Sequence, residues 1–188
     1  MTKNLKLKSL FLISISYFLF FIASAQAAEL FFETKNREVG LNSQFKVDIL
    51  INTQGEEINA IEGSVVFPWG FFGVKEISDG NSIINFWAQK PKLVLDNEII
   101  FSGIVPGGYK GSNAKLFSII FQSLKEGNAT IDFSGLKVLL NDGNGTPAEL
   151  KIQNYKIPVF IFPEKSEEEI IQETGSFRFS PKEISATI

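Results

Sequence analysis

The residue types best suited to holding an ion lie in a short glycine-rich segment, residues 141–146, with the sequence Asn-Asp-Gly-Asn-Gly-Thr. Asp142 and Asn144 are two positions apart, and the glycines permit a sharp turn. Because Ca²⁺ prefers carboxylate, amide and backbone oxygens, the spacing predicts a weak structural calcium site. No bidentate Glu follows at EF-hand spacing, so the alternative is a glycine-rich turn held by hydrogen bonds of the Asp and Asn side chains.

Most catalytic chemistry is excluded by composition, because the 188 residues include neither His nor Cys. Ser-His-Asp and Cys-His catalysis, a zinc site with N and S ligands and a disulfide framework all need one of these residues. A glycosidase needs only two carboxylates. None of the available acidic residues has a recognisable catalytic context, so we expect no enzyme and no cofactor beyond the calcium considered above. The acidic residues considered are Glu56, Glu57, Glu62, Asp79, Asp96, Glu98 and Asp132.

Aromatic side chains offer a different chemistry, because coplanar Trp and Tyr rings can stack on the faces of sugars. Trp69 and Tyr109 are flanked by Pro and Gly, and we consider both as residues that stack on carbohydrate. Trp87 and the 19 Phe residues are expected mainly in the core or in the leader described next, since large aromatic side chains are usually buried.

The first 27 residues have the pattern of a secretory signal peptide. Lys3, Lys6 and Lys8 form a basic region, an apolar run of residues 10–22 follows, and Ala25 and Ala27 supply small residues before the cleavage point. The apolar run is shorter than the roughly 20 residues that a spanning helix needs. Cleavage after Ala27 takes the formal net charge from −3 to −6, which argues against nucleic acid as a partner. We therefore expect a secreted protein, extracellular or at the cell surface, with no membrane span in the mature chain.

The remaining chain has the pattern of an all-β protein. In residues 44–52, Phe45, Val47, Ile49 and Ile51 alternate with other side chains, which is typical of a strand with one buried face. Short runs of this kind recur about every ten residues, separated by Gly, Asn, Asp or Pro, and indicate a β-sandwich over residues 28–160. Residues 161–188 are predicted to be an acidic linker or tail that could begin another module. The other predicted strands are residues 58–67, 72–77, 82–87, 92–95, 98–102, 115–123, 129–133, 136–140 and 149–152.

Four segments in this order resemble a bacterial cohesin domain, with the likeness running from about residue 29 to residue 158. The resemblance implies a jelly-roll β-sandwich of about nine strands, without catalytic residues, that binds a dockerin on another protein and scaffolds polysaccharide-degrading proteins. The four segments are Glu57-Ile-Asn-Ala-Ile-Glu-Gly-Ser-Val-Val-Phe-Pro68, Val74-Lys-Glu-Ile-Ser-Asp-Gly-Asn-Ser82, Ile100-Phe-Ser-Gly103 with Pro106-Gly-Gly-Tyr-Lys-Gly111, and Val138-Leu-Leu-Asn-Asp-Gly-Asn-Gly-Thr-Pro147.

The same resemblance implies that a partner binds one sheet face that includes residues 58–67 and 98–103. Side chains alternate across a strand, so if Ile61, Val65, Phe67 and Phe101 point inward, their neighbours point outward. A β-bulge would invert part of this assignment. The predicted partner-binding residues are Ala60, Glu62, Ser64, Ile100 and Ser102.

Three functions remain compatible with these observations. The first is a monomeric, exported module that binds a dockerin-like protein. The second is a carbohydrate-binding module for a polysaccharide, favoured if Trp69 and Tyr109 are exposed and coplanar. The third is a structural stalk or envelope domain, favoured if the outward strand faces are uniformly polar.

Overall fold

The computed structural model describes residues 27–151 and 156–163. This part of the chain is built of strands, and none of its segments is a helix that could cross a membrane. Its ten strands are β1 (Glu29–Glu33), β2 (Glu38–Gly40), β3 (Gln44–Asn52), β4 (Ile58–Val66), β5 (Phe72–Ser78), β6 (Phe86–Leu95), β7 (Glu98–Tyr109), β8 (Ala114–Ser123), β9 (Gly127–Leu140) and β10 (Lys156–Phe162).

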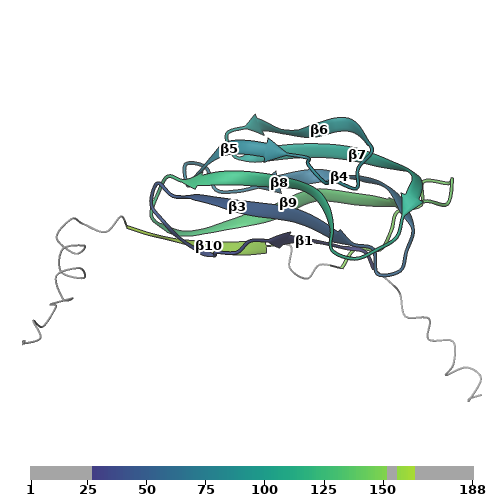
Figure 1. The fold of residues 1–188 in the computed structure, drawn as a ribbon, viewed down its shortest axis with the longest axis horizontal. Helices are drawn as coiled ribbons and strands as arrows, with labels where there is room; N and C mark the ends of the chain where they lie inside the picture. The colour runs from purple at the N-terminus through teal and green to yellow at the C-terminus, as the bar shows by residue number, and fades with distance from the viewer. Residues whose placement is uncertain (1–26, 152–155, 164–188) are drawn as a thin grey trace, which may run out of the picture.

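The strands form two sheets that pack face to face as a β-sandwich (Figure 1). One sheet has four strands in the order β1-β3-β8-β5, and the other has six in the order β2-β10-β9-β4-β7-β6. Every pairing is antiparallel except that of β2 with β10. The all-β sandwich predicted from the alternating pattern is therefore confirmed, with one strand more than the nine expected.

The sandwich has two ends, which are named here after the residues in their loops. The Trp69 end carries the connections 67–71, 96–97 and 124–126, and the Asp142 end carries the connections 53–57, 110–113 and 141–147. β1 starts at the Asp142 end, where Glu29 pairs with Asn52, whereas β10 finishes at the Trp69 end, where Phe162 pairs with Gly40. The two terminal strands therefore approach their chain ends at opposite ends of the sandwich.

Aromatic rings fill the space between the two sheets. Phe121 of β8 is fully buried, and its ring centroid lies 5.1 Å from that of Phe67, which directly follows β4 in the other sheet. Phe45 and Phe72 complete this cluster, with centroids 5.6 and 5.5 Å from that of Phe121. Further along the sandwich, other ring pairs also join the two sheets: Phe32 with Phe133 at 3.9 Å, and Phe101 with Phe117 at 5.0 Å. Aromatic contacts thus connect the sheets along their length.

Several predicted strand boundaries are wrong. Residues 82–85 lie outside the strands, and residues 86–95 form one strand, β6, which is interrupted by irregular pairing. Residues 129–133 and 136–140 are likewise one strand, because Gly135 adopts a positive φ of 60° and lets the backbone continue through a bulge. The strand predicted at residues 149–152 is reduced to a bridge between Leu150 and Ala28 in its described part.

The edges of the predicted sandwich domain lie close to the limits of the described residues. β10 continues to Phe162, past the predicted boundary at residue 160, and its Val159 and Ile161 are buried in the core. The predicted signal peptide, except for Ala27, lies outside the described residues. The acidic tail after residue 163 also lies outside them.

Phe121→Ala is expected to lower the free energy of unfolding by about 3–5 kcal/mol, because it removes a buried ring that contacts three others. The matched control is Phe86→Ala, which removes the same side chain from a site that is 59% exposed and should cost less than about 1 kcal/mol. Denaturant unfolding followed by circular dichroism measures both values. Equal losses in the two variants would contradict the assignment of Phe121 to the core.

Candidate functional site

The predicted partner-binding residues lie together on the outward face of the six-stranded sheet. β4 pairs with β7 so that Glu62 lies opposite Ser102 and Ser64 lies opposite Ile100. Glu62 is exposed, and Ala60, Ser64, Ile100 and Ser102 are partly exposed. The side chains predicted to point inward, Ile61, Val65, Phe67 and Phe101, are each no more than 3% exposed. The structure therefore confirms the predicted orientation of both strands, whereas the binding role of these residues stays a prediction.

A β-bulge lies in the middle of this face, but it does not invert residues 60–66 of β4. Glu62 pairs with Lys137 and Ser64 with Ser134, so one residue of β4 lies opposite two residues of β9. The extra residue belongs to β9, at Gly135 and Leu136, and Gly135 takes the positive φ that such a bulge needs. Because β9 absorbs this irregularity, β4 keeps its alternation from Ala60 to Val66. A second irregularity, between Ile58 and Ala60, lies in β4 itself and leaves both Ile58 and Ile61 buried.

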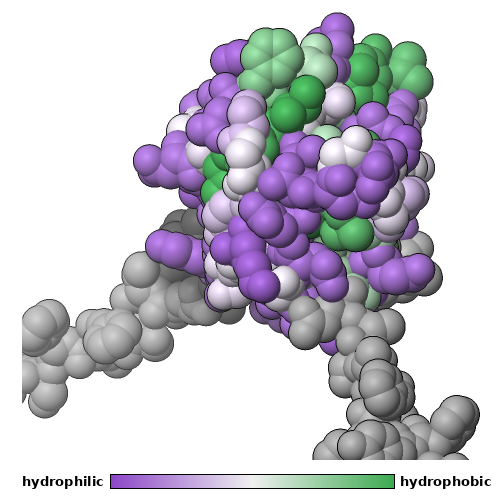
Figure 2. All heavy atoms as spheres, turned by 90° about the vertical axis from the view of Figure 1, so that its right-hand side faces the viewer, coloured by the Kyte–Doolittle hydropathy of each residue, from purple (hydrophilic) through white to green (hydrophobic). Residues whose placement is uncertain are grey.

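Apolar side chains form a row across four strands of this face, near the Asp142 end. Phe86 of β6 pairs with Ile104 of β7, Ile104 pairs with Ala60 of β4, and Ala60 pairs with Leu139 of β9. We call these four residues the apolar row. Phe86 is 59% exposed and Ile104 is 37% exposed. Seen from the Asp142 end, hydrophobic surface gathers at the upper edge, on the side where β6 lies in Figure 1 (Figure 2).

The expectation that Phe86 belongs to the core is wrong. Phe86 and Trp87 are adjacent on one strand, so their side chains point to opposite faces and only one of them can reach the core. Trp87 takes the inward position, with its ring centroid 6.4 Å from that of buried Phe117. The adjacency of two aromatic residues in a predicted strand was the signal that could have identified an exposed ring.

The rows of paired residues that follow the apolar row toward the Trp69 end are more polar. Lys137 and Glu62 form an ion pair across β9 and β4, with 3.8 Å between Nζ and Oε1. Both side chains are more than half exposed, so this pair adds little stability but sets the local charge pattern. The face therefore offers an apolar row beside hydrogen-bonding groups, the composition from which protein-binding surfaces are built. The three rows, of which the last also contains the exposed Leu95, are Gln89, Ser102, Glu62 and Lys137; Lys92, Ile100, Ser64 and Ser134; and Leu95, Glu98, Val66 and Asp132.

Trp69 and Tyr109 are not a pair. Trp69 follows the last residue of β4 and is 74% exposed, whereas Tyr109 pairs with Ile58, the first residue of β4, and packs partly against the core. The length of a nine-residue strand, about 30 Å at the usual rise, separates the two positions along the sheet. The two rings therefore cannot stack on the same sugar.

The loop predicted to bind calcium is held by its own hydrogen bonds. The backbone amide of Asn144 donates to Oδ1 of Asp142 at 2.8 Å, and the Thr146 hydroxyl donates to Oδ2. The bond from Thr146, followed by that from the Asn144 backbone, lowers the pKa of Asp142 below its ordinary value. In the described part of the chain, no three acidic residues come together as metal ligands. These hydrogen bonds fit the alternative interpretation, a glycine-rich turn stabilised by Asx interactions. Calcium binding by Asp142 and Asn144 stays a hypothesis.

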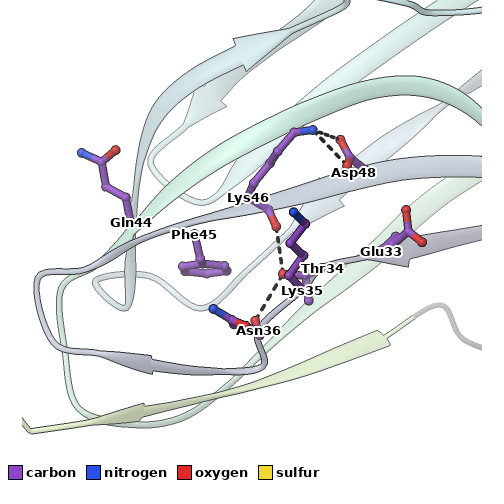
Figure 3. Close-up of a pocket in the computed structure, with 8 residues that line it drawn as sticks. All are labelled: Glu33, Thr34, Lys35, Asn36, Gln44, Phe45, Lys46 and Asp48. Carbon is purple, nitrogen blue, oxygen red and sulfur yellow. Dashed lines mark hydrogen bonds and ion pairs between the residues drawn. The ribbon is translucent and has the colours of Figure 1, made fainter.

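A depression of about 680 Å³ lies beside the four-stranded sheet, between the loop after β1 and the first half of β3 (Figure 3). Two of its charged groups are paired, since Lys46 Nζ lies 2.8 Å from Asp48 Oδ1. Burial raises the pKa of Asp48, but hydrogen bonds from Lys46 and Ser118 outweigh this effect and hold the pKa below its usual range. Asp48 is therefore an ionised partner of Lys46 and is not poised as a general acid.

Solved cohesin structures have the same architecture as this chain. The cohesin module of a family 33 glycoside hydrolase from Clostridium perfringens is 18% identical over 72% of this chain and 98% of its own length, with a TM-score of 0.57. A non-cellulosomal cohesin from the archaeon Archaeoglobus fulgidus is 15% identical over 78% of this chain and 97% of its own, with a TM-score of 0.58. The cohesin of the Coh-OlpA-Doc918 complex from Clostridium thermocellum is 16% identical over 72% of this chain and 99% of its own, also at 0.58.

The chain therefore has the cohesin fold, as the four segments between residues 57 and 147 predicted. No protein-family model matches the sequence, and no curated protein matches it. The likeness lies in the path of the backbone, because the identities are below one residue in five.

Asp142→Ala is expected to lower the melting temperature slightly at pH 7, because two hydrogen bonds to the carboxylate are lost. Since the pKa of Asp142 is lowered in the folded protein, its contribution is present above the ordinary value of 3.8 and disappears as the pH falls through the lowered pKa. The difference from the unsubstituted protein should therefore shrink in melts at progressively lower pH. Millimolar Ca²⁺, added after chelation, should leave both melting temperatures unchanged, and a rise in the unsubstituted protein alone would establish the calcium site instead.

Proposed function

We propose that this protein is a non-catalytic, exported binding module that docks a dockerin-type protein on the outward face of β9, β4, β7 and β6. Cohesins with this fold have been solved in complex with dockerins, including those named Coh-OlpA-Doc918 and Coh-OlpC-Doc435. By this proposal, the partner is part of a polysaccharide-degrading assembly that the module helps to hold outside the cell or at its surface.

The apolar row is the observation that carries this proposal. Phe86 and Ile104 remain exposed although apolar side chains are the ones that burial stabilises, and the neighbouring rows toward the Trp69 end supply hydrogen-bonding groups beside them. In protein interfaces a few large apolar side chains beside hydrogen-bonding groups can provide most of the binding energy. The sheet holds these side chains in place through its pairing, so little ordering is needed when a partner binds.

The apolar row also argues against the third function, a stalk without a soluble ligand. A purely structural domain has no need for an exposed Phe and Ile side by side on one sheet, and its outward strand faces are expected to be polar. Carbohydrate binding by Trp69 and Tyr109 acting together is disfavoured by their positions at opposite ends of β4.

Phe86→Ala and Ile104→Ala are each expected to weaken dockerin binding by about tenfold or more, as is typical of the few interface residues that provide most of the binding energy. The matched control is Leu93→Ala, also on β6 and 40% exposed, but paired with inward-facing Ile99 and so outside the apolar row. Isothermal titration calorimetry with dockerin modules from the source organism, both proteins being in solution, measures the affinities. Melting curves check that each variant is folded. Equal binding by the row variants and the unsubstituted protein would contradict this site.

Export predicts a mature chain that begins at Ala28 and loses the three lysines of the leader. Ala28 already belongs to the sandwich, since its amide donates to the Glu149 carbonyl at 2.8 Å and its carbonyl accepts from the Lys151 amide at 2.9 Å. Mass spectrometry of protein recovered from the culture medium or the cell surface tests this start. A protein found only inside the cell with residues 1–27 attached would contradict export.

A further inference from the structure

Trp69 and the surface beside it are not explained by the proposed docking function. Trp69 is 74% exposed, although a Trp ring has more apolar surface to bury than almost any other side chain. It lies at the Trp69 end of the six-stranded sheet, whereas the apolar row lies near the Asp142 end. The docking function therefore leaves this exposed ring without a role.

The backbone presents Trp69 on a fixed turn. The Phe71 amide donates to the Pro68 carbonyl at 3.3 Å, and Gly70 has a φ of 76°, which places Trp69 at the second position of a type II turn. Both flanks of the turn are anchored: Phe67 is buried in the aromatic cluster, and the Lys125 ammonium lies 5.0 Å from the centroid of the Phe71 ring. The turn therefore holds the exposed ring at its apex without help from a ligand.

A notch of about 420 Å³ lies next to this turn, where β4 ends and its neighbour β9 continues. β4 stops at Val66, whereas β9 extends beyond it to Gly127, so the sheet lacks a strand between Thr130 and the β6–β7 turn at Asn97. The notch is open to solvent, so a ligand in it would contact the protein along one side. The described residues that line the notch are Val66, Phe67, Pro68, Asn97, Thr130 and Asp132.

The notch combines apolar walls with hydrogen-bonding groups. Asn97 is positioned by its carbonyl, which accepts from the Phe67 amide at 3.1 Å, and Oδ1 of Asp132 accepts from the Phe133 amide at 2.8 Å. Thr130 is exposed and points outward, because its neighbours Ala129 and Ile131 are buried. Among the described lining residues Asp132 alone carries a charge, and that charge is negative, which disfavours anionic ligands.

We propose that the notch binds a neutral pyranose unit of a polysaccharide, stacked on the Trp69 ring. A pyranose has an apolar face of C–H groups, which suits an exposed indole, and a rim of hydroxyls, which suits the amide of Asn97, the hydroxyl of Thr130 and the carboxylate of Asp132. Phe160 of β10, 45% exposed and facing outward beside β9, extends the apolar surface away from the notch. This ligand is separate from the protein partner, and either can bind without the other.

The purified protein is titrated with soluble mixed-linkage β-glucan, xylan and galactomannan, with polygalacturonate as an anionic control, and binding is followed by affinity electrophoresis and tryptophan fluorescence. At least one neutral polysaccharide should bind and polygalacturonate should not. Trp69→Ala should weaken binding by about tenfold or more, and Thr130→Val, which removes one hydroxyl, by about threefold.

Leu124→Ala is the matched control, because Leu124 is 48% exposed at the same end but belongs neither to the Pro68–Phe71 turn that carries Trp69 nor to the lining of the notch. It should bind as the unsubstituted protein does, and Trp87→Phe should leave the fluorescence response of Trp69 in place. Failure of all three neutral polysaccharides to bind, or equal binding by Trp69→Ala, would overturn the proposal. If Trp69→Ala instead impairs dockerin binding, the notch belongs to a protein contact and the sugar proposal is wrong.

Discussion

The contact between aromatic rings of the two sheets is the interaction on which the rest of this structure depends. Without a cysteine, the chain has no covalent link between sheets, and the burial of rings such as Phe121, Phe67, Phe117 and Phe101 must hold the layers together. Each buried ring contributes both apolar area and a preferred ring geometry. Because the inward side chains are committed to this packing, the alternation of each strand decides which residues remain on the outer faces.

The composition of the outward face of β9, β4, β7 and β6 is a consequence of this inward packing. Ile61, Val65 and Phe101 face the core, so Ala60, Ser64 and Ile100 must face outward, and strand pairing aligns them into rows. Alignment survives from Ala60 to Val66 because the bulge at Gly135 lies in β9 and leaves the alternation of this part of β4 intact. A flat sheet face thereby becomes a surface whose side chains are already in place before any partner arrives.

The sequence predicted the strands that alternate regularly and failed where pairing is distant in the chain. The alternation from Phe45 to Ile51 predicted the bounds of β3, and alternation in residues 58–67 identified the outward residues of β4. β2 has only three residues and pairs in parallel with β10, which lies more than a hundred positions later, so no local pattern reveals it. β10 contains Pro158, and a Pro in a sequence argues against a strand, although here Pro158 pairs with Thr130. The apolar row and the notch each combine segments from several strands, and single-strand patterns do not show which residues meet.

The placement of the terminal strands determines how the domain would respond to tension. A pull that separates the start of β1 from the finish of β10 acts along the strand axes, because these points lie at opposite ends of the sandwich. Such a pull slides β1 against β3, and β10 against β9 and β2, so the hydrogen bonds of each ladder resist together and do not open one at a time. Resistance to forced unfolding depends on the unfolding rate, and this arrangement predicts a high mechanical threshold for a domain with no cross-link.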